Sequence, residues 1–129
     1  MRVRYAETDQ MGVAYYSNYL VWFEVGRTEY CRSCGFTYAE MERETESFIV
    51  VAEARCRYRT PLRYDMGFVV RTRILELRRR TMKFGYEILS EDGGTVYAVG
   101  ETRHVVTGAD GRPKSGPEKY LRLLQKSNE

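Results

Sequence analysis

The chain has few of the residues on which metal, redox and secreted proteins depend. It contains one histidine, three cysteines and three prolines among 129 residues. Cys31 and Cys34 have CxxC spacing, yet no second such pair completes a tetrahedral zinc site. The pair closes an expected helix, whereas a redox CxxC motif opens one. We therefore interpret Cys31, Cys34 and Cys56 as structural thiols of a cytoplasmic protein that needs neither metal nor cofactor.

Long apolar runs and common catalytic fingerprints are also missing. No stretch approaches the roughly 20 apolar residues that span a bilayer, and the basic start at Arg2 and Arg4 is not that of a signal peptide. The P-loop, the dinucleotide-binding glycine motif, HExxH and GxSxG are absent. We therefore expect no membrane span and no nucleotide triphosphatase, zinc-protease or serine-hydrolase chemistry. Without a linker or low-complexity run, residues 1–129 are predicted to form one domain.

The excess of positive charge is small. Lys and Arg number 21 against 18 Asp and Glu, which gives a formal net charge of +3. A nucleic-acid-binding domain usually carries a denser basic face, so no nucleic-acid partner is expected. The charge does suit an anionic ligand such as a CoA nucleotide.

Periodicity predicts an α+β fold. Apolar residues recur at helical spacing over residues 16–34, and Gly35 follows in the position that commonly ends a helix. Shorter helices are expected at residues 37–46 and 117–125. Period-two alternation predicts five strands, at residues 2–5, 47–60, 67–78, 81–90 and 95–107.

The long helix is apolar around most of its circumference, which predicts that other structure wraps it. A curved antiparallel five-stranded sheet around one long central helix, the hotdog fold, satisfies both patterns. Leu75 and Leu77 interrupt the alternation of their strand and indicate a bulge. An open sheet leaves unpaired edges, which a dimer joined edge to edge would cover.

The loop before the long helix carries the residues best suited to acyl-transfer chemistry. Asp9 can attack a thioester carbonyl or activate a water as general base, and the sequence does not decide between these roles. Its carboxylate could instead only close an Asx-turn. Tyr16 lies at the expected helix start, where its backbone amide can donate to an oxyanion and the helix dipole adds positive charge. Its ring could alternatively pack against the sheet.

Six further positions are candidates for substrate binding. Gly12 would let the loop approach a ligand, or would only turn the chain. Ser17 or Asn18 is expected to cap the helix, and the alternative for Asn18 is a bond back to the loop of Asp9. A basic hairpin suits the phosphates of CoA or is a solvated turn, and it comprises Arg78, Arg79, Arg80 and Thr81. Arg112 and Lys114 are weaker candidates for the same phosphates.

Three other polar residues are expected to be structural. Glu24 and Arg27 are three apart on one helix face and can form an ion pair. His104 is the lone histidine, but it lies on an expected strand far along the chain from Asp9, with no identifiable partner aspartate.

The segment Asp9-x-x-Gly12-x-x-Tyr15-Tyr16-x-Asn18-Tyr19 resembles the signature of the hotdog-fold acyl-CoA thioesterases, of the 4-hydroxybenzoyl-CoA and Tol-Pal-associated types. The similarity continues through residues 58–65, 72–77 and 101–105. It implies that Asp9 is the catalytic carboxylate and that the basic hairpin holds CoA phosphates. It also implies a homodimer or homotetramer with the active site at a subunit interface. Many Tol-Pal-type relatives have histidine where this chain has Tyr16, so Asp9 is the only strong titrating group in the motif.

These observations predict an acyl-CoA thioesterase that hydrolyses an acyl- or aroyl-CoA to the free acid and CoA. Two alternatives stay open: an acyl-ACP thioesterase, and a non-catalytic module that binds acyl groups. A hotdog dehydratase is a weaker option, because such enzymes generally need a histidine facing a carboxylate across the site.

Overall fold

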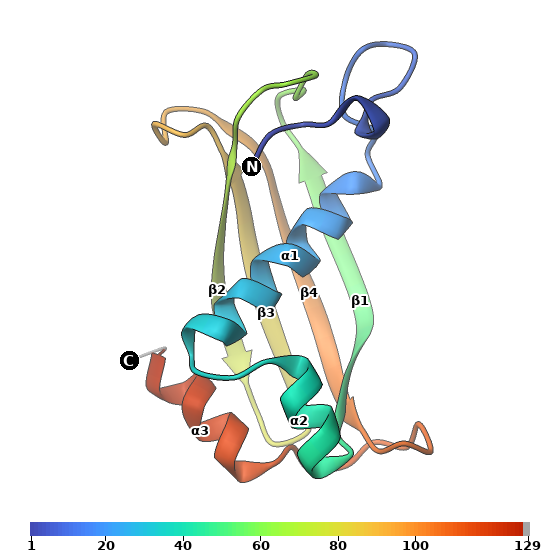
Figure 1. Cartoon of the computed structure of the whole chain (residues 1–129), viewed down its shortest axis with the longest axis vertical. Coiled ribbons are helices and arrows are strands. Elements are labelled where there is room, and N and C mark those ends of the chain that lie inside the picture. The colour runs from blue at the N-terminus through green and yellow to red at the C-terminus, as the bar shows by residue number, and fades with distance from the viewer. Residues whose placement is uncertain (128–129) are drawn as a thin grey trace.

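The computed structural model describes residues 1–127, which form one antiparallel sheet with helices on one face (Figure 1). The strands are β1 (Phe48–Tyr58), β2 (Val69–Leu77), β3 (Thr81–Leu89) and β4 (Val96–Thr107), in the spatial order β1-β4-β3-β2. The long helix α1 (Asn18–Ser33) crosses the sheet, while α2 (Tyr38–Thr45) and α3 (Glu118–Ser127) lie near one end of it. The α+β class and the sheet wrapped on one long helix, predicted from periodicity, are confirmed.

The expected fifth strand is wrong: the sheet has four strands among the described residues. The N-terminus does pair briefly beside β2, since the Val3 amide donates to the Met66 carbonyl at 3.0 Å. The pairing stops at Arg4, whose amide donates instead to the Glu7 carboxylate at 2.8 Å, and Tyr5–Glu7 form a 3-10 turn. A side-chain acceptor thus takes the amide that a continuing strand would have needed.

The helix ends predicted from the sequence agree with the observed ends to within two residues. Gly35 follows α1 with φ of 103°, the conformation that glycine tolerates best after a helix. Thr37 caps α2, because its hydroxyl accepts a hydrogen bond from the Glu40 amide at 3.2 Å. The expected bulge is also present, as a register shift between Ile74 and Glu76 in the pairing of β2 with β3.

Two glycines allow α1 to lie close against the sheet. A Cβ on Gly26 of α1 would come within 2.5 Å of the Thr72 hydroxyl on β2. A Cβ on Gly100 of β4 would come within 2.4 Å of the Phe23 ring. The side chains that fill this interface are buried aromatic and aliphatic groups, among them Trp22, Phe23, Phe68, Phe84 and Ile88.

The opposite face of α1 is not covered by residues 1–127. Val21 and Val25 on that face are exposed, and so are Val50 and Val51 on β1, each with 46% of its surface accessible. β1 is also an edge strand of 11 residues that pairs only with β4. No helix in residues 1–127 is both long enough and apolar enough to cross a membrane.

Candidate active site

Asp9 lies in a tight loop that its own side chain closes. Its Oδ1 accepts hydrogen bonds from the amides of Met11, at 2.9 Å, and Val13, at 3.4 Å. The backbone amide of Asp9 donates to the Val13 carbonyl at 2.9 Å. The Asx-turn considered as an alternative is therefore present. The second carboxylate oxygen accepts no hydrogen bond from residues 1–127, so it is available to a ligand.

Gly12 makes the turn of this loop possible. Its φ is 79°, a conformation in which any other residue would be strained. Its amide donates to the Asp9 carbonyl at 3.0 Å. Apart from Gly12 and its two chain neighbours, no heavy atom of residues 1–127 lies within 4 Å of the position that a Cβ would take. The loop is therefore open on this side.

Tyr16 precedes α1, which begins two residues later than expected. Its carbonyl oxygen accepts from the Tyr19 amide at 3.3 Å and from the Tyr58 hydroxyl at 3.0 Å. Its own N–H donates no hydrogen bond within the described part of the chain. This free amide lies at the N-terminal end of α1, where the helix dipole is positive.

Asn18 does not cap α1, so that expectation is wrong. The capping position belongs to Ser17, whose side chain makes no capping hydrogen bond. The Asn18 amide group instead donates to the Glu7 carbonyl at 2.9 Å. The alternative, a bond from Asn18 back to the loop that carries Asp9, is the one observed.

A pocket of about 280 Å³ lies between this loop and the end of β1. Its lining comprises Asp9, Val13, Ala14, Tyr15, Tyr16, Tyr19, Tyr58, Arg59, Thr60 and Pro61. Among the described residues that line it, Asp9 is the only one with a carboxylate. Burial and the neighbouring Cys56 thiol raise the pKa of Tyr58 to about 12, so this phenol stays neutral at physiological pH.

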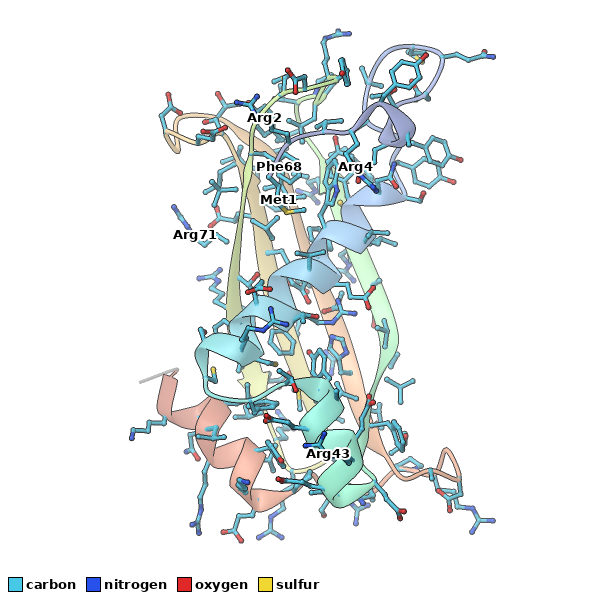
Figure 2. The ribbon with its side chains drawn as sticks, in the orientation of Figure 1. Met1, Arg2, Arg4, Arg43, Phe68 and Arg71 are labelled. Atoms are coloured by element: carbon cyan, nitrogen blue, oxygen red, sulfur yellow. The ribbon has the colours of Figure 1, made fainter. Side chains whose placement is uncertain are left out.

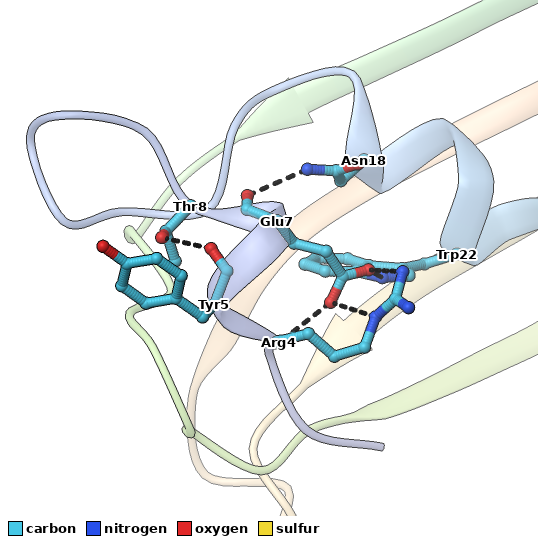
Figure 3. A network of polar contacts seen from close by, with 6 residues as sticks. All are labelled: Arg4, Tyr5, Glu7, Thr8, Asn18 and Trp22. Carbon is cyan, nitrogen blue, oxygen red and sulfur yellow. Dashed lines mark hydrogen bonds and ion pairs between the residues drawn. The ribbon is translucent and has the colours of Figure 1, made fainter.

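Sequence reasoning missed Glu7, a carboxylate that is only 6% exposed. Figure 3 shows its polar contacts with Arg4, Trp22 and Asn18. Its Oε1 accepts from the Arg4 amide at 2.8 Å, and its Oε2 accepts from the Trp22 indole at 3.0 Å. Burial alone would raise the pKa of Glu7, but these hydrogen bonds and the Arg4 guanidinium lower it overall. The spacing of Arg4 and Glu7, which is that of a capping box, is the signal that could have indicated this role.

The basic hairpin is not brought to Asp9 within one chain. The turn between β2 and β3, residues 78–80, lies at the end of the sheet near α2 and α3, whereas the Asp9 loop lies at the other end (Figure 1). Figure 2 shows the same separation in side chains, with Arg4 at the end that carries the Asp9 loop and Arg43 of α2 at the opposite end. Arg78 forms an ion pair with Glu76 at 2.8 Å.

The other polar candidates lie outside the pocket. No ion pair joins Glu24 to Arg27 in residues 1–127, contrary to expectation. His104 is 1% exposed, and its Nε2 lies 2.7 Å from the Thr102 hydroxyl. Burial, together with the nearby Arg27 guanidinium, lowers the pKa of His104 to about 4, so its imidazole is neutral.

The cysteines form no disulfide. Burial raises the pKa of Cys31 to about 11, which leaves its thiol protonated. In the residues that the structure describes, no three His, Cys, Asp or Glu side chains are grouped so as to hold a metal ion.

Comparison with known proteins identifies the class. The model of the thioesterase-like superfamily matches residues 3–124, so the chain belongs to this superfamily. Two bacterial relatives have comparable sequences. YneP of Bacillus subtilis is 43% identical over 93 residues, covering 72% of this chain and 67% of YneP. The acyl-CoA thioesterase YbgC of Haemophilus influenzae is 33% identical over 89 residues, covering 69% of this chain and 65% of that protein.

A solved structure gives the same result for the fold. The DHNA-CoA thioesterase of Staphylococcus aureus superposes with a TM-score of 0.91 at 30% identity, covering 98% of this chain and 87% of that one. The resemblance inferred from the motif around Asp9 is thus confirmed at the level of the family. The chain is a thioester hydrolase of the hotdog fold.

Proposed function

We propose that the protein hydrolyses an acyl- or aroyl-CoA thioester, with Asp9 and the Tyr16 backbone amide as the reacting groups. One observation carries this proposal. Both residues line the same pocket. Within residues 1–127, one carboxylate oxygen of Asp9 accepts no hydrogen bond, and the backbone amide of Tyr16 donates none. The relatives named as CoA thioesterases support CoA as the carrier.

The thioester carbonyl oxygen would bind against the Tyr16 N–H. Negative charge that develops on this oxygen is stabilised by the amide and by the positive end of α1. The free oxygen of Asp9 either takes a proton from an attacking water, or attacks the carbonyl carbon to form an anhydride that water then cleaves. Each route breaks the C–S bond, consumes one water and releases the acid and CoA.

The pocket suits an acyl group that is apolar or aromatic. Rings of Tyr15, Tyr16, Tyr19 and Tyr58 surround it, and the Tyr19 and Tyr58 rings lie edge to face with centroids 4.9 Å apart. Such rings present flat apolar surface together with hydroxyl groups that can hydrogen-bond a polar substituent. Gly12 would contribute by keeping the loop beside Asp9 open.

We further propose that the working enzyme is a homo-oligomer built on a dimer joined through β1. The exposed edge of this 11-residue strand offers unpaired backbone groups, and Val50 and Val51 on it are 46% exposed. The uncovered face of α1, with Val21 and Val25, would be buried in the same contact. A two-fold axis perpendicular to the sheet makes the pairing antiparallel, with the Tyr58 end of one β1 beside the Phe48 end of the other.

This dimer would bring the basic hairpin of one chain to the pocket of the other. Phe48 pairs with Thr107 at the end of β4, and the hairpin turn adjoins that end because the Val106 amide donates to the Arg80 carbonyl at 2.9 Å. The hairpin lies two strand spacings, about 10 Å, from β1. Arg79, Arg80 and Lys114 of the partner subunit would then hold the CoA phosphates.

Turnover of a panel of acyl- and aroyl-CoAs, followed with a thiol reagent, tests the proposed function. We expect thiol release from at least one member and inhibition by free CoA. Hydrolysis confined to acyl-ACP and insensitive to free CoA would assign the other carrier. Binding of acyl-CoA without turnover of any member would overturn the proposal in favour of a non-catalytic module.

A further inference from the structure

We propose that Glu7 is a positioning residue for this reaction: it fixes the Asp9 loop to the start of α1 and so sets where the Asp9 carboxylate lies relative to the Tyr16 amide. This inference rests on the proposed function. Glu7 acts through the Asp9 loop and does not contact the substrate.

The environment of Glu7 shows that its carboxylate has a fixed place. It is the only acidic side chain that is buried among the described residues. Burying a carboxylate is costly unless hydrogen bonds and an opposite charge compensate it. Both oxygens are engaged: Oε1 by the Arg4 amide at 2.8 Å, and Oε2 by the Trp22 indole at 3.0 Å and an Arg4 guanidinium nitrogen at 3.5 Å (Figure 3).

Trp22 connects this carboxylate to the rigid core. It lies in the second turn of α1 and is 1% exposed. Its ring packs against Phe68 with centroids 4.4 Å apart and against Tyr19 with centroids 4.9 Å apart. A hydrogen bond to an indole held on two sides restrains the Glu7 side chain, and through it the backbone of the 3-10 turn.

The backbone of Glu7 makes a second connection to the same helix. Its carbonyl oxygen accepts from the Tyr15 amide at 2.8 Å and from the Asn18 side chain at 2.9 Å. Tyr15 directly precedes Tyr16, and Asn18 is the first residue of α1. The side chain and the carbonyl of Glu7 therefore both attach to the segment that presents the Tyr16 amide.

From Glu7 the chain reaches Asp9 in two residues, and both are paired across the loop. Thr8 forms an antiparallel bridge with Ala14, and the Asp9 amide donates to the Val13 carbonyl at 2.9 Å. Glu7 therefore helps to fix the position of the Asp9 carboxylate on one side of the loop and that of the Tyr16 amide on the other. A shift of about 1 Å between reacting groups can cost about a hundredfold in rate.

Glu7→Gln tests the role, because glutamine keeps the shape but replaces one acceptor oxygen with a donor group. For the acyl-CoA that the wild type turns over best, we expect kcat to fall about tenfold or more, and KM to change by less than about threefold. Glu87→Gln is the matched control. Glu87 is a partly exposed glutamate on β3 that pairs with Arg71, and its removal should leave kcat unchanged.

A double-mutant cycle separates positioning from a general loss of folded protein. If Glu7 acts through Asp9, Glu7→Gln should change the residual turnover of Asp9→Asn by less than about twofold. A purely structural defect would lower turnover by the same factor in both backgrounds, and that result would overturn the inference. Should Glu7→Gln not fold, Asn18→Ala removes only the hydrogen bond to the Glu7 carbonyl and should lower kcat in the same Asp9-dependent way.

The failure of this inference can be told apart from the failure of the proposed function. Wild-type turnover that Asp9→Asn abolishes but Glu7→Gln leaves intact contradicts the positioning role and retains the thioesterase. A wild-type chain that turns over no thioester contradicts both.

Discussion

The hydroxyl of Tyr58, the last residue of β1, donates a hydrogen bond of 3.0 Å to the carbonyl oxygen of Tyr16, just before α1. The two residues are 42 positions apart in the sequence. This hydrogen bond connects two parts of the proposed mechanism. Tyr58 lies on the edge strand through which we propose that the dimer forms, and Tyr16 carries the backbone amide that we propose binds the oxyanion. A change in how β1 pairs at the dimer interface should therefore also move the Tyr16 segment.

Tyr16→Pro should remove the proposed oxyanion donor, together with the Tyr16 ring that lines the pocket. Proline lacks the N–H and is tolerated just before and at the first turn of a helix. We expect kcat to fall by about 10²–10³-fold, the usual cost of losing one such donor. Tyr16→Ala is the matched control, because it loses the ring as proline does but keeps the amide, and its kcat should exceed that of Tyr16→Pro by about the same 10²–10³-fold. Near-normal turnover by a folded Tyr16→Pro, checked by circular dichroism, would exclude this amide as the donor.

A charge on the exposed edge of β1 should dissociate the proposed dimer. Val51→Lys places an ammonium group where a second β1 would pack, and burying it unpaired is unfavourable. Analytical ultracentrifugation should show a monomer with little turnover. Val69→Lys is the control, because Val69 is 44% exposed but lies on β2 at the other edge of the sheet. A Val51→Lys protein that stays dimeric would place the interface elsewhere.

Mixed dimers should show that each site draws on both chains. A chain with Asp9→Asn and a chain with both Arg79→Ala and Arg80→Ala should each have low turnover at limiting acyl-CoA. If the hairpin serves the partner's pocket, a heterodimer of the two contains one intact site. Co-expressed chains should then recover up to about half of the wild-type turnover per heterodimer. Turnover no greater than that of the separate variants would show that the hairpin does not act across the interface.

The patterns that the sequence predicted well are those fixed by neighbouring residues. Alternation along β3, helical spacing along α1 and the positive φ of Gly35 each depend on a few adjacent positions. The Asp9 loop was found for the same reason, because its motif is contiguous. The Asx-turn is compatible with the ligand-binding role that we propose, because the turn uses Oδ1 and leaves the second oxygen of the carboxylate for a ligand.

The features that sequence reasoning missed depend on distant contacts. The first expected strand ends because the Glu7 carboxylate takes the Arg4 amide, and Glu7 is held in place by Trp22, fifteen positions away. Asn18 has the composition of a cap but bonds to the Glu7 carbonyl, eleven positions before it. The separation of the basic hairpin from Asp9 follows from the order of the strands, which periodicity does not give.

His104 should make the stability of the fold depend on pH. Its pKa is about 4 in the folded chain and about 6.5 when unfolded, so between these values the unfolded chain binds more protons. The free energy of unfolding should therefore fall as pH drops from about 6.5 toward 4, by up to about 3 kcal/mol in total from this residue. Urea unfolding of wild type and His104→Gln at several pH values isolates the contribution, because the glutamine does not titrate. Parallel curves for the two proteins would contradict it.

The most direct test of the account is the turnover of Asp9→Asn on the acyl-CoA that the wild type hydrolyses best. Asparagine keeps an oxygen that can accept from the Met11 amide and so preserves the turn, but it can neither attack a carbonyl nor accept a proton from water. Asp65→Asn, at an exposed aspartate beside Arg2, matches the change in charge. We predict that kcat falls by at least about 10²-fold for Asp9→Asn and is unchanged for Asp65→Asn. Equal turnover by the two folded variants would contradict the assignment of Asp9 as the catalytic carboxylate.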